Sequence, residues 1–401
     1  MKTMTDTRLA TLRTEVLAEL EQHILDYWIR NTRDDVHGGF LGAVDGFGRP
    51  RPGAPKGAIL NARILWTFAA AYRLTGRREY LEMAETARRE ILDRFRDPVY
   101  GGIWWSLDAE GRPLDTKKQF YAIAFAIYGL SEHARATGDP ESLAAARALY
   151  EDIEAHSFDA ARNGYIEACT REWGAIADMR LSEKDANERK TMNTHLHILE
   201  AYTALYRVWK DPLLAAKLEN LILLFTDRIT DPETGHLILF FDDDWICRDR
   251  TVSYGHDIEA SWLLTEAAAV LGNPAVAERV AVTSGRLAAA AAEGLSGDGG
   301  LRYEMNPVTG AADGDRHWWV QAEAVTGWFY RYVRTGAEAD LDKALACWDF
   351  IKEHIVDRTY GEWIWSLRAD GTPNRTDDKA GFWKCPYHNG RMCMELIEGI
   401  K

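Results

Sequence analysis

The 401-residue chain lacks several features that would assign it to a particular class of protein. No stretch approaches the ~18 uninterrupted apolar residues that a membrane-spanning helix needs. The opening residues, Met1 to Asp6, carry no apolar segment of the kind a secretion signal requires. The five cysteines are odd in number and match no zinc-ligand spacing, so we expect reduced thiols. These absences favour a globular cytoplasmic protein.

Basic residues are in the minority. Lys and Arg total 48 against 62 Asp and Glu, which gives a formal net charge of −14. An acidic chain with no basic run is a poor partner for phosphate backbones or an anionic membrane surface. We therefore expect neither nucleic-acid binding nor membrane binding. Tryptophan, by contrast, is abundant at 15 residues, and its flat apolar face suits both a large core and the rings of sugars.

A short pattern recurs along the chain: glycine, an alternating apolar run, and then a polar turn. Several copies end in a turn signal such as Asp108-Ala109-Glu110-Gly111, so we expect each copy to form a small β-hairpin. The copies are spaced 61 to 71 residues apart and are marked by Gly39, Gly102, Gly164, Gly235, Gly300 and Gly361. Six such units account for the whole chain.

Helical spacing of apolar residues fills the segments between these motifs. It predicts twelve helices, over residues 7–30, 57–75, 78–95, 116–136, 140–156, 190–209, 212–228, 256–271, 274–293, 317–335, 338–355 and 382–399. A pair of helices cannot bury its apolar stripe alone, whereas a closed ring leaves no exposed end. We therefore expect an all-α fold, a single (α/α)6 barrel over residues 1–401 with short β-hairpins at its mouth. The alternative is an open α-solenoid, which the glycine-aromatic motifs disfavour.

Polar and aromatic residues gather where the predicted inner helices begin, which would place them at the mouth of the barrel. Three of these helices carry a histidine there, namely His197, His256 and His388, and Arg63 adds a permanent cation. Converging helix N-termini would favour a transient anion. Such a site suits proton abstraction next to a carbonyl. It suits glycoside hydrolysis less well, because that usually needs two carboxyl groups ~5–9.5 Å apart.

Spacing along a helix indicates which of these side chains share a face. Asn193 and His197 are four residues apart and lie together, whereas His195 points ~200° away from His197, which disfavours a His-x-His metal pair. His256 and Glu259 are three residues apart. The Glu259 carboxylate is therefore predicted either to orient the imidazole or to hold a substrate hydroxyl.

The chain resembles the N-acylglucosamine 2-epimerase superfamily and, within it, most closely the cellobiose 2-epimerases. The resemblance runs along nearly the whole chain, and its most specific segments are residues 61–66 (NARILW), 182–188 (SEKDANE), 193–197 (NTHLH), 255–259 (GHDIE), 318–323 (WWVQAE) and 383–389 (WKCPYHN). It implies an isomerase that uses no cofactor or metal. Such an enzyme would invert C2 of the reducing-end glucose in β-1,4-linked disaccharides, such as cellobiose or lactose, to give mannose. Its partner would be a disaccharide or monosaccharide substrate, with the chain a monomer or weak homodimer.

The same resemblance implies a role for each site residue. His256 and His388 would move the C2 proton through a cis-enediolate, with Arg63 neutralising the enediolate oxygen. His197 would assist ring opening and closure. The remaining positions would bind the sugar: Asn193, Tyr121 and Glu259 through hydroxyl groups, and Trp319, Trp383 and Tyr303 through the faces of the sugar rings.

Chemistry explains why two bases are needed, since a single base would return the proton to the face it left. At the unperturbed pKa of ~6.5, one histidine can start neutral and the other protonated. Alternatives on the same fold are a mannose 2-epimerase, an N-acylglucosamine 2-epimerase or an aldose–ketose isomerase. Two further alternatives are a glycoside hydrolase using Asp257, Glu259 or Glu323 and a helical-repeat scaffold that binds proteins.

Overall fold

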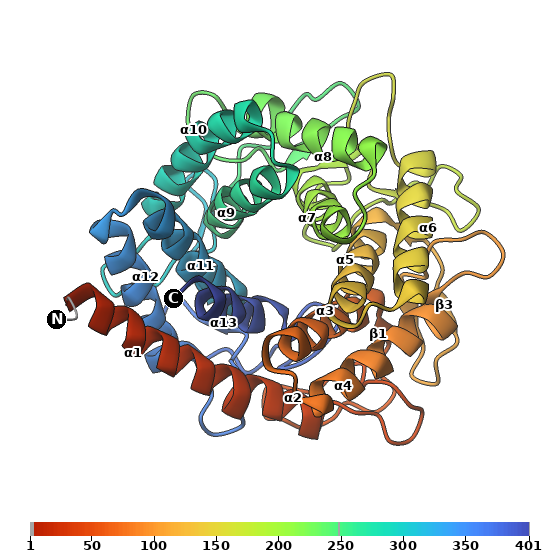
Figure 1. Ribbon diagram of the computed structural model, residues 1–401, viewed down its shortest axis with the longest axis horizontal. Coiled ribbons are helices and arrows are strands. Elements are labelled where there is room, and N and C mark those ends of the chain that lie inside the picture. The colour runs from red at the N-terminus through yellow and green to blue at the C-terminus, as the bar shows by residue number, and fades with distance from the viewer. Residues whose placement is uncertain (1–3, 248, 401) are drawn as a thin grey trace.

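The computed structural model describes residues 4–247 and 249–400, and it is a closed ring of helices. Six helices surround the axis and six lie outside them (Figure 1), so the predicted (α/α)6 barrel is confirmed. The inner helices are α3 (Ala58–Thr75), α5 (Phe120–Thr137), α7 (Met192–Val208), α9 (Tyr254–Leu271), α11 (Trp318–Thr335) and α13 (Tyr387–Gly399). The outer ones are α1 (Met4–Glu19) continuing through a π-helical turn into α2 (Asp26–Asn31), α4 (Arg78–Arg89), α6 (Pro140–His156), α8 (Pro212–Leu224), α10 (Pro274–Ala291) and α12 (Glu338–Phe350).

The boundaries within each helical pair follow from local chemistry. Four inner helices end at a left-handed glycine, for example Gly76 (φ 71°) and Gly138 (φ 76°), a conformation that glycine adopts without a Cβ penalty. The Asp139 side chain then caps the next outer helix by accepting from Ser142 N, with proline following at the first helical position. These ends match the predicted breaks. Within the described chain, no helix is both long enough and apolar enough to cross a membrane.

Short strands join successive units at the mouth of the barrel, which differs in part from the predicted hairpins. Local hairpins form at β2–β3 and β9–β10, but the strand before an inner helix pairs with the apolar run of the next unit: β1 with β2, β4 with β5, β6 with β7, β8 with β9 and β11 with β12. This pairing occupies residues that we expected to be helical, so α5 begins at Phe120 rather than 116. The strands are β1 (Lys56–Gly57), β2 (Ser106–Leu107), β3 (Pro113–Asp115), β4 (Lys118–Gln119), β5 (Ala168–Cys169), β6 (Lys190–Thr191), β7 (Phe240–Phe241), β8 (Val252–Ser253), β9 (Glu304–Met305), β10 (Ala312–Asp313), β11 (Arg316–His317) and β12 (Ser366–Leu367).

A seam between the first and last units closes the ring without a covalent link. Val44 and Ala380 form the β-bridge that continues the pairing between units. Beside it, tryptophan indoles donate to glutamates across the seam: Trp28 to Glu362 (3.2 Å), Trp363 to Glu19 (2.7 Å) and Trp348 to Glu15 (2.7 Å). Each of these bonds satisfies an indole N–H that is largely or wholly buried.

Buried lysines fix the start of several inner helices. Lys118 and Lys190, directly before α5 and α7, pair with Asp97 (3.0 Å) and Asp159 (3.1 Å) in the glycine turns of their units. The lysine side chains are fully buried, and ions in such places are stable only when they are paired and hydrogen-bonded. Each pair therefore holds the mouth of one unit in place.

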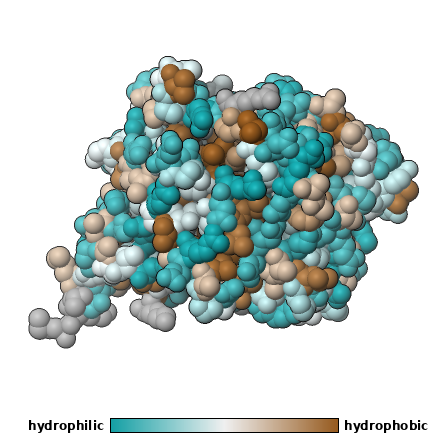
Figure 2. All heavy atoms as spheres, turned by 90° about the horizontal axis from the view of Figure 1, so that it is seen from above, coloured by the Kyte–Doolittle hydropathy of each residue, from teal (hydrophilic) through white to brown (hydrophobic). Residues whose placement is uncertain are grey.

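The face of the molecule seen in Figure 2 is mainly polar. Hydrophilic residues cover most of the face shown in Figure 2, where apolar side chains lie in small groups. This face offers no extensive apolar surface of the kind that a scaffold for protein partners would use. All five cysteines are free thiols, as predicted, and four of them are buried.

Glu167 joins two units beneath the start of α7. Its carboxylate accepts hydrogen bonds from the hydroxyls of Thr191 and Thr194, both at 2.7 Å, and Thr191 also caps α7 by accepting from Thr194 N. Burial raises the pKa of Glu167 to about 7. The carboxyl group therefore holds its proton more tightly in the folded chain than in the unfolded one, and this contribution to stability is lost as the pH rises through 7.

We predict that Glu167→Gln raises the free energy of unfolding at high pH. Near pH 5 the two proteins should be similar, whereas at pH 9 the variant should be more stable by about 3 kcal/mol, because it has no carboxylate to desolvate. Urea denaturation across this range measures the difference. Glu110→Gln, on an exposed turn, is the control and should leave the pH dependence unchanged. Identical pH dependence in Glu167→Gln and wild type would contradict the prediction.

Candidate active site

A cavity of about 270 Å³ opens where the inner helices begin. Every inner helix contributes to its wall, because the strands and ion pairs at the mouth place the first turns of these helices around one space. All ten residues proposed from the sequence border it: Arg63, Tyr121, Asn193, His197, His256, Glu259, Tyr303, Trp319, Trp383 and His388. The structure thus brings together residues that lie up to 325 positions apart in the sequence.

Three of the four histidines that line the cavity are held in the same way, through Nδ1, and the fourth is His317 at the rim. His197 bonds Glu200 (2.8 Å), His388 bonds Glu323 (2.7 Å) and His256 bonds the Ser253 hydroxyl (2.8 Å). Because Nδ1 of each ring is hydrogen-bonded to a protein side chain, Nε2 is the nitrogen available to a ligand. A carboxylate partner requires the proton on Nδ1, so the neutral His197 and His388 each present a lone pair at Nε2. Ser253 can donate or accept, so His256 can present either a lone pair or an N–H.

The prediction that the Glu259 carboxylate orients the His256 imidazole is wrong. Ser253, at the N-cap of α9, holds His256, because this residue is placed one turn before the imidazole. Glu259 instead accepts from Arg391 Nη2 at 2.7 Å, and its carboxylate oxygen is 4.0 Å from His388 Nδ1. Glu259 still borders the cavity, which leaves it free to contact a sugar hydroxyl.

Desolvation changes the charge state expected of the two central histidines. It lowers the pKa of His256 and of His388 to about 3, and for His388 it outweighs the hydrogen bond that the ring donates to Glu323. Without substrate, both imidazoles are therefore neutral at pH 7, which corrects the expectation of a pKa near the unperturbed value. Burial opposes ionisation of Glu323 as well, but Arg391 and His388 lower the pKa of this carboxyl to about 2. Burial and the neighbouring Glu323 raise the pKa of Glu259 well above its ordinary value.

Aromatic rings and one guanidinium complete the wall. The Trp319 ring lies 4.8 Å from the His256 ring and 5.6 Å from the His388 ring, so a single indole contacts both imidazoles. Arg63 donates to the Tyr121 hydroxyl at 2.8 Å and to the Trp383 carbonyl at 3.2 Å, which fixes a cation beside the cavity. At the rim, Tyr303 stacks on His317 with ring centroids 4.2 Å apart.

Several residues of the site were not identified from the sequence. Ser253 and Glu200 are three residues before His256 and three after His197, a helical spacing that could have suggested them. Glu323 was considered only as a hydrolase carboxylate. Arg391, three residues after His388, was not among the predicted site residues. Ser182, Lys184 and Asp185 were noted as a motif and also line the cavity.

Two groups of side chains have the composition of a metal site. Glu259, Glu323 and His388 have ligand atoms within 4.8 Å of one another, as do Asp313, Asp315 and His317 near the rim. In the first group the Arg391 guanidinium lies 2.7 Å from both carboxylates, so a metal ion would have to displace it.

His195 faces away from the cavity and bonds Tyr165 N and the Thr191 carbonyl, which agrees with the predicted divergence from His197.

Comparisons with known proteins agree with this geometry. The model of the N-acylglucosamine 2-epimerase (GlcNAc 2-epimerase) family matches residues 38–390. A cellobiose 2-epimerase of Bacteroides fragilis is 61% identical over 386 residues, which cover 96% of this chain and 98% of the relative. A cellobiose 2-epimerase of Ruminococcus albus is 41% identical over 384 residues, covering 96% and 97%. The solved structure of a cellobiose 2-epimerase from Bacillus thermoamylovorans superposes with a TM-score of 0.93 at 41% identity, over 97% of this chain and 99% of that one.

An (α/α)6 barrel with imidazoles, aromatic rings and a guanidinium around one cavity, together with these relatives, defines a carbohydrate epimerase, which is an isomerase. The chain belongs to the N-acylglucosamine 2-epimerase family.

We predict that the imidazoles of His256 and His388 remain neutral between about pH 5 and pH 8 in the unliganded protein. His236 provides an internal contrast: burial opposes its protonation, but the hydrogen bond to Asp257 raises its pKa. Two-bond ¹H–¹⁵N spectra of ¹⁵N-histidine-labelled protein should show His236 keeping its proton to a higher pH than a free imidazole does, while the rings of His256 and His388 stay neutral. Titration of His256 or His388 near pH ~6.5 would contradict the prediction.

Proposed function

We propose that the protein is a cellobiose 2-epimerase, converting the reducing-end glucose of β-1,4-linked disaccharides to mannose by inversion at C2. In the opened sugar, one histidine removes the C2 proton at its Nε2. The electron pair of the C–H bond forms the C1–C2 double bond of a cis-enediolate, while the π electrons of the C1 carbonyl move onto O1. The other histidine, which takes up a proton from solvent as the negative charge develops, delivers it to the opposite face of C2; the C1–C2 π electrons form the new C–H bond, and the O1 electron pair restores the C1 carbonyl. Developing negative charge on the sugar favours the protonated form of both imidazoles and so opposes the desolvation that keeps them neutral beforehand.

The observation that carries this proposal is the placement of His256 and His388 on one cavity with Nδ1 of each tied to the protein. Both rings contact Trp319, which sets them around a common volume. His388, backed by the Glu323 carboxylate, presents a lone pair and is suited to proton abstraction. His256, backed by a hydroxyl that can donate or accept, is suited to either direction. The identity and coverage of the related cellobiose 2-epimerases support the choice of substrate.

The remaining residues would hold the sugar and the charge. Arg63, beside the cavity and bonded to Tyr121, would neutralise the enediolate oxygen without itself changing protonation. His197, with Glu200 behind it, would move protons between O1 and O5 during ring opening and closure. Sugar contacts would come from the hydroxyl-binding groups and ring platforms Asn193, Tyr121, Glu259, Trp319, Trp383 and Tyr303.

We predict that incubation with cellobiose in heavy water gives glucosyl-mannose that carries deuterium at C2. The glycosidic bond should persist, because the proposed chemistry breaks only a C–H bond. Proton NMR and mass spectrometry of the sugars measure both outcomes. Release of free glucose would instead indicate a hydrolase, and deuterium at C1 of a ketose would indicate an aldose–ketose isomerase. A comparison of cellobiose, lactose, mannose and N-acetylglucosamine would separate the remaining epimerases.

We predict that His256→Ala and His388→Ala each lower kcat at least about 1,000-fold while the far-UV circular dichroism is unchanged, because each removes a base that no neighbour can replace. The matched control is His37→Ala, which changes an exposed histidine in a turn on the outside and should retain full activity. Near-normal turnover in either cavity variant would refute the two-base assignment.

A further inference from the structure

Arg391 links the supports of two cavity histidines. It lies on α13 one turn after His388, and it is only 1% exposed. Its Nη2 donates to Glu323 and to Glu259, each at 2.7 Å, and its Nη1 donates to Glu200 and to the Tyr387 hydroxyl. Glu323 and Glu200 are the carboxylates that hold Nδ1 of His388 and of His197. One guanidinium therefore contacts the partner of each imidazole.

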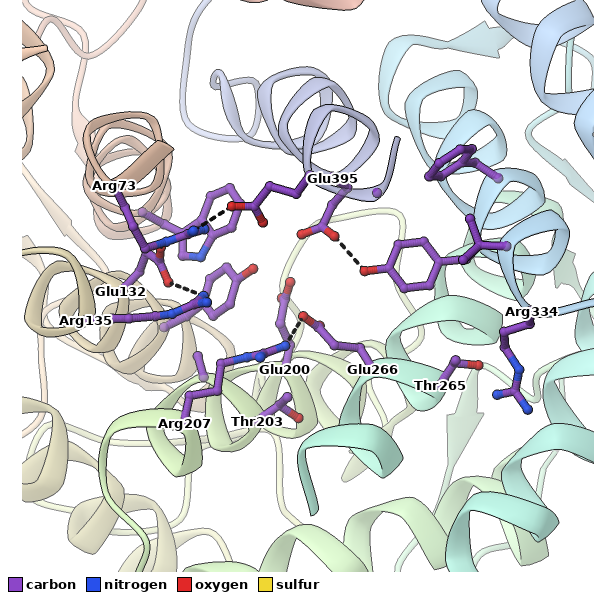
Figure 3. A pocket seen from close by; sticks show the side chains of 18 residues that line it. Arg73, Glu132, Arg135, Glu200, Thr203, Arg207, Thr265, Glu266, Arg334 and Glu395 are labelled. Atoms are coloured by element: carbon purple, nitrogen blue, oxygen red, sulfur yellow. Dashed lines mark hydrogen bonds and ion pairs between the residues drawn. The ribbon is translucent and has the colours of Figure 1, made fainter. Parts of the chain in front are cut away.

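Within this network, Glu259, His197 and His388 border the active-site cavity, whereas Arg391, Glu323, Glu200 and Tyr387 do not. Arg391 does not border the cavity, whereas Glu200 borders a second cavity on the opposite side, between the C-terminal halves of the inner helices (Figure 3). Ion pairs such as Arg73–Glu132 and Arg207–Glu266 line that second cavity. Arg391 does not reach the substrate space, so its hydrogen-bonded connection to the two imidazoles runs through the carboxylates, although its charge also lowers the pKa of His388 and of His197 directly.

The protonation of these carboxylates decides which nitrogen of each imidazole carries hydrogen. An ionised Glu323 accepts from Nδ1–H and leaves the lone pair of His388 at Nε2, facing the cavity. A neutral Glu323 would donate its O–H to Nδ1 and force the imidazole proton onto Nε2, which removes the base. The same holds for Glu200 and His197. Three buried carboxyl groups around a single guanidinium repel one another, so the cation is needed to keep these two ionised.

The charged and titratable groups that face this network come from every inner helix. They are Arg63 on α3, Tyr128 on α5, His197 and Glu200 on α7, Glu259 and Glu266 on α9, Glu323 on α11, and Tyr387, His388 and Glu395 on α13. Within the described residues, Arg391 is the one side chain that makes hydrogen bonds to both Glu200 and Glu323.

We propose that Arg391 is a positioning residue that keeps Glu323 and Glu200 ionised and thereby fixes the Nδ1–H tautomer of His388 and of His197 together. The consequence for catalysis rests on the proposed function, whereas the tautomers themselves do not. The two can therefore be tested separately.

The first test measures the tautomers by two-bond ¹H–¹⁵N spectra of ¹⁵N-histidine-labelled full-length protein at pH 7. Wild type should show Nδ1–H for His197 and His388, and Arg391→Gln should convert both to Nε2–H. Arg391→Met, whose apolar chain retains packing against Trp262, is a second neutral variant should the first not fold. Arg73→Gln, which removes an arginine of the second cavity, is the control and should leave both tautomers unchanged. Nδ1–H on both rings in a folded neutral variant would overturn the proposal.

The second test measures kcat with cellobiose as a function of pH. In Arg391→Gln, kcat at pH 7 should fall at least about 100-fold. Part of this loss should be recovered at higher pH, where Glu323 ionises. The acid limb of the kcat–pH profile should therefore move up by at least about one pH unit. Arg391→Lys keeps the charge and should keep the limb in place. A uniform loss with an unshifted limb would indicate a merely structural role and overturn the proposal. If wild type does not epimerise cellobiose, the proposed function fails, while the tautomer test still decides the role of Arg391.

Discussion

The inner helices are buried on nearly every side, and this burial is possible only because the ring closes. Closure forces six helix starts to meet around one space, and the strands that pair between units, together with buried lysine–aspartate pairs, fix where each start lies. The active-site cavity is a product of this arrangement. Residues from all six inner helices become neighbours because their first turns share the mouth of one barrel.

Burial also determines the chemistry of the site. Removing His256 and His388 from water favours their neutral forms, and neutral imidazoles are bases from the outset. The pKa values of two neighbouring carboxyl groups shift in opposite directions. Contact with Arg391 lowers the pKa of Glu323, whereas burial raises that of Glu259. The buried polar network can therefore determine which nitrogen of each imidazole carries a proton before a ligand binds.

The sequence contained enough to predict the barrel, and the reason is its regularity. Glycines recurring every 61 to 71 residues marked the units, and the 3.6-residue spacing of apolar side chains marked the helices between them. Position on a helix could also place Arg63, His197, His256 and His388 at the mouth. Trp383 and Tyr303, which precede the helix or strand nearest to them, were predicted only from the family resemblance. The sequence could not give the partners of the histidines. Glu323 and His388 lie 65 residues apart on different helices, and whether Glu259 or Ser253 reaches His256 depends on side-chain packing. Nor could it give the lowered pKa values, which depend on how completely the assembled ring excludes water.

The tryptophan–glutamate seam has a consequence for how the chain acquires its structure. Its hydrogen bonds join residues separated by more than 330 positions, so Glu15 and Glu19 can meet their tryptophan partners only after the final unit has been synthesised. During synthesis on the ribosome, the first five units therefore have a face that no neighbouring unit covers. Completion of the barrel is then a late, long-range docking event, and its speed is limited by the search for contacts between the two ends of the polypeptide.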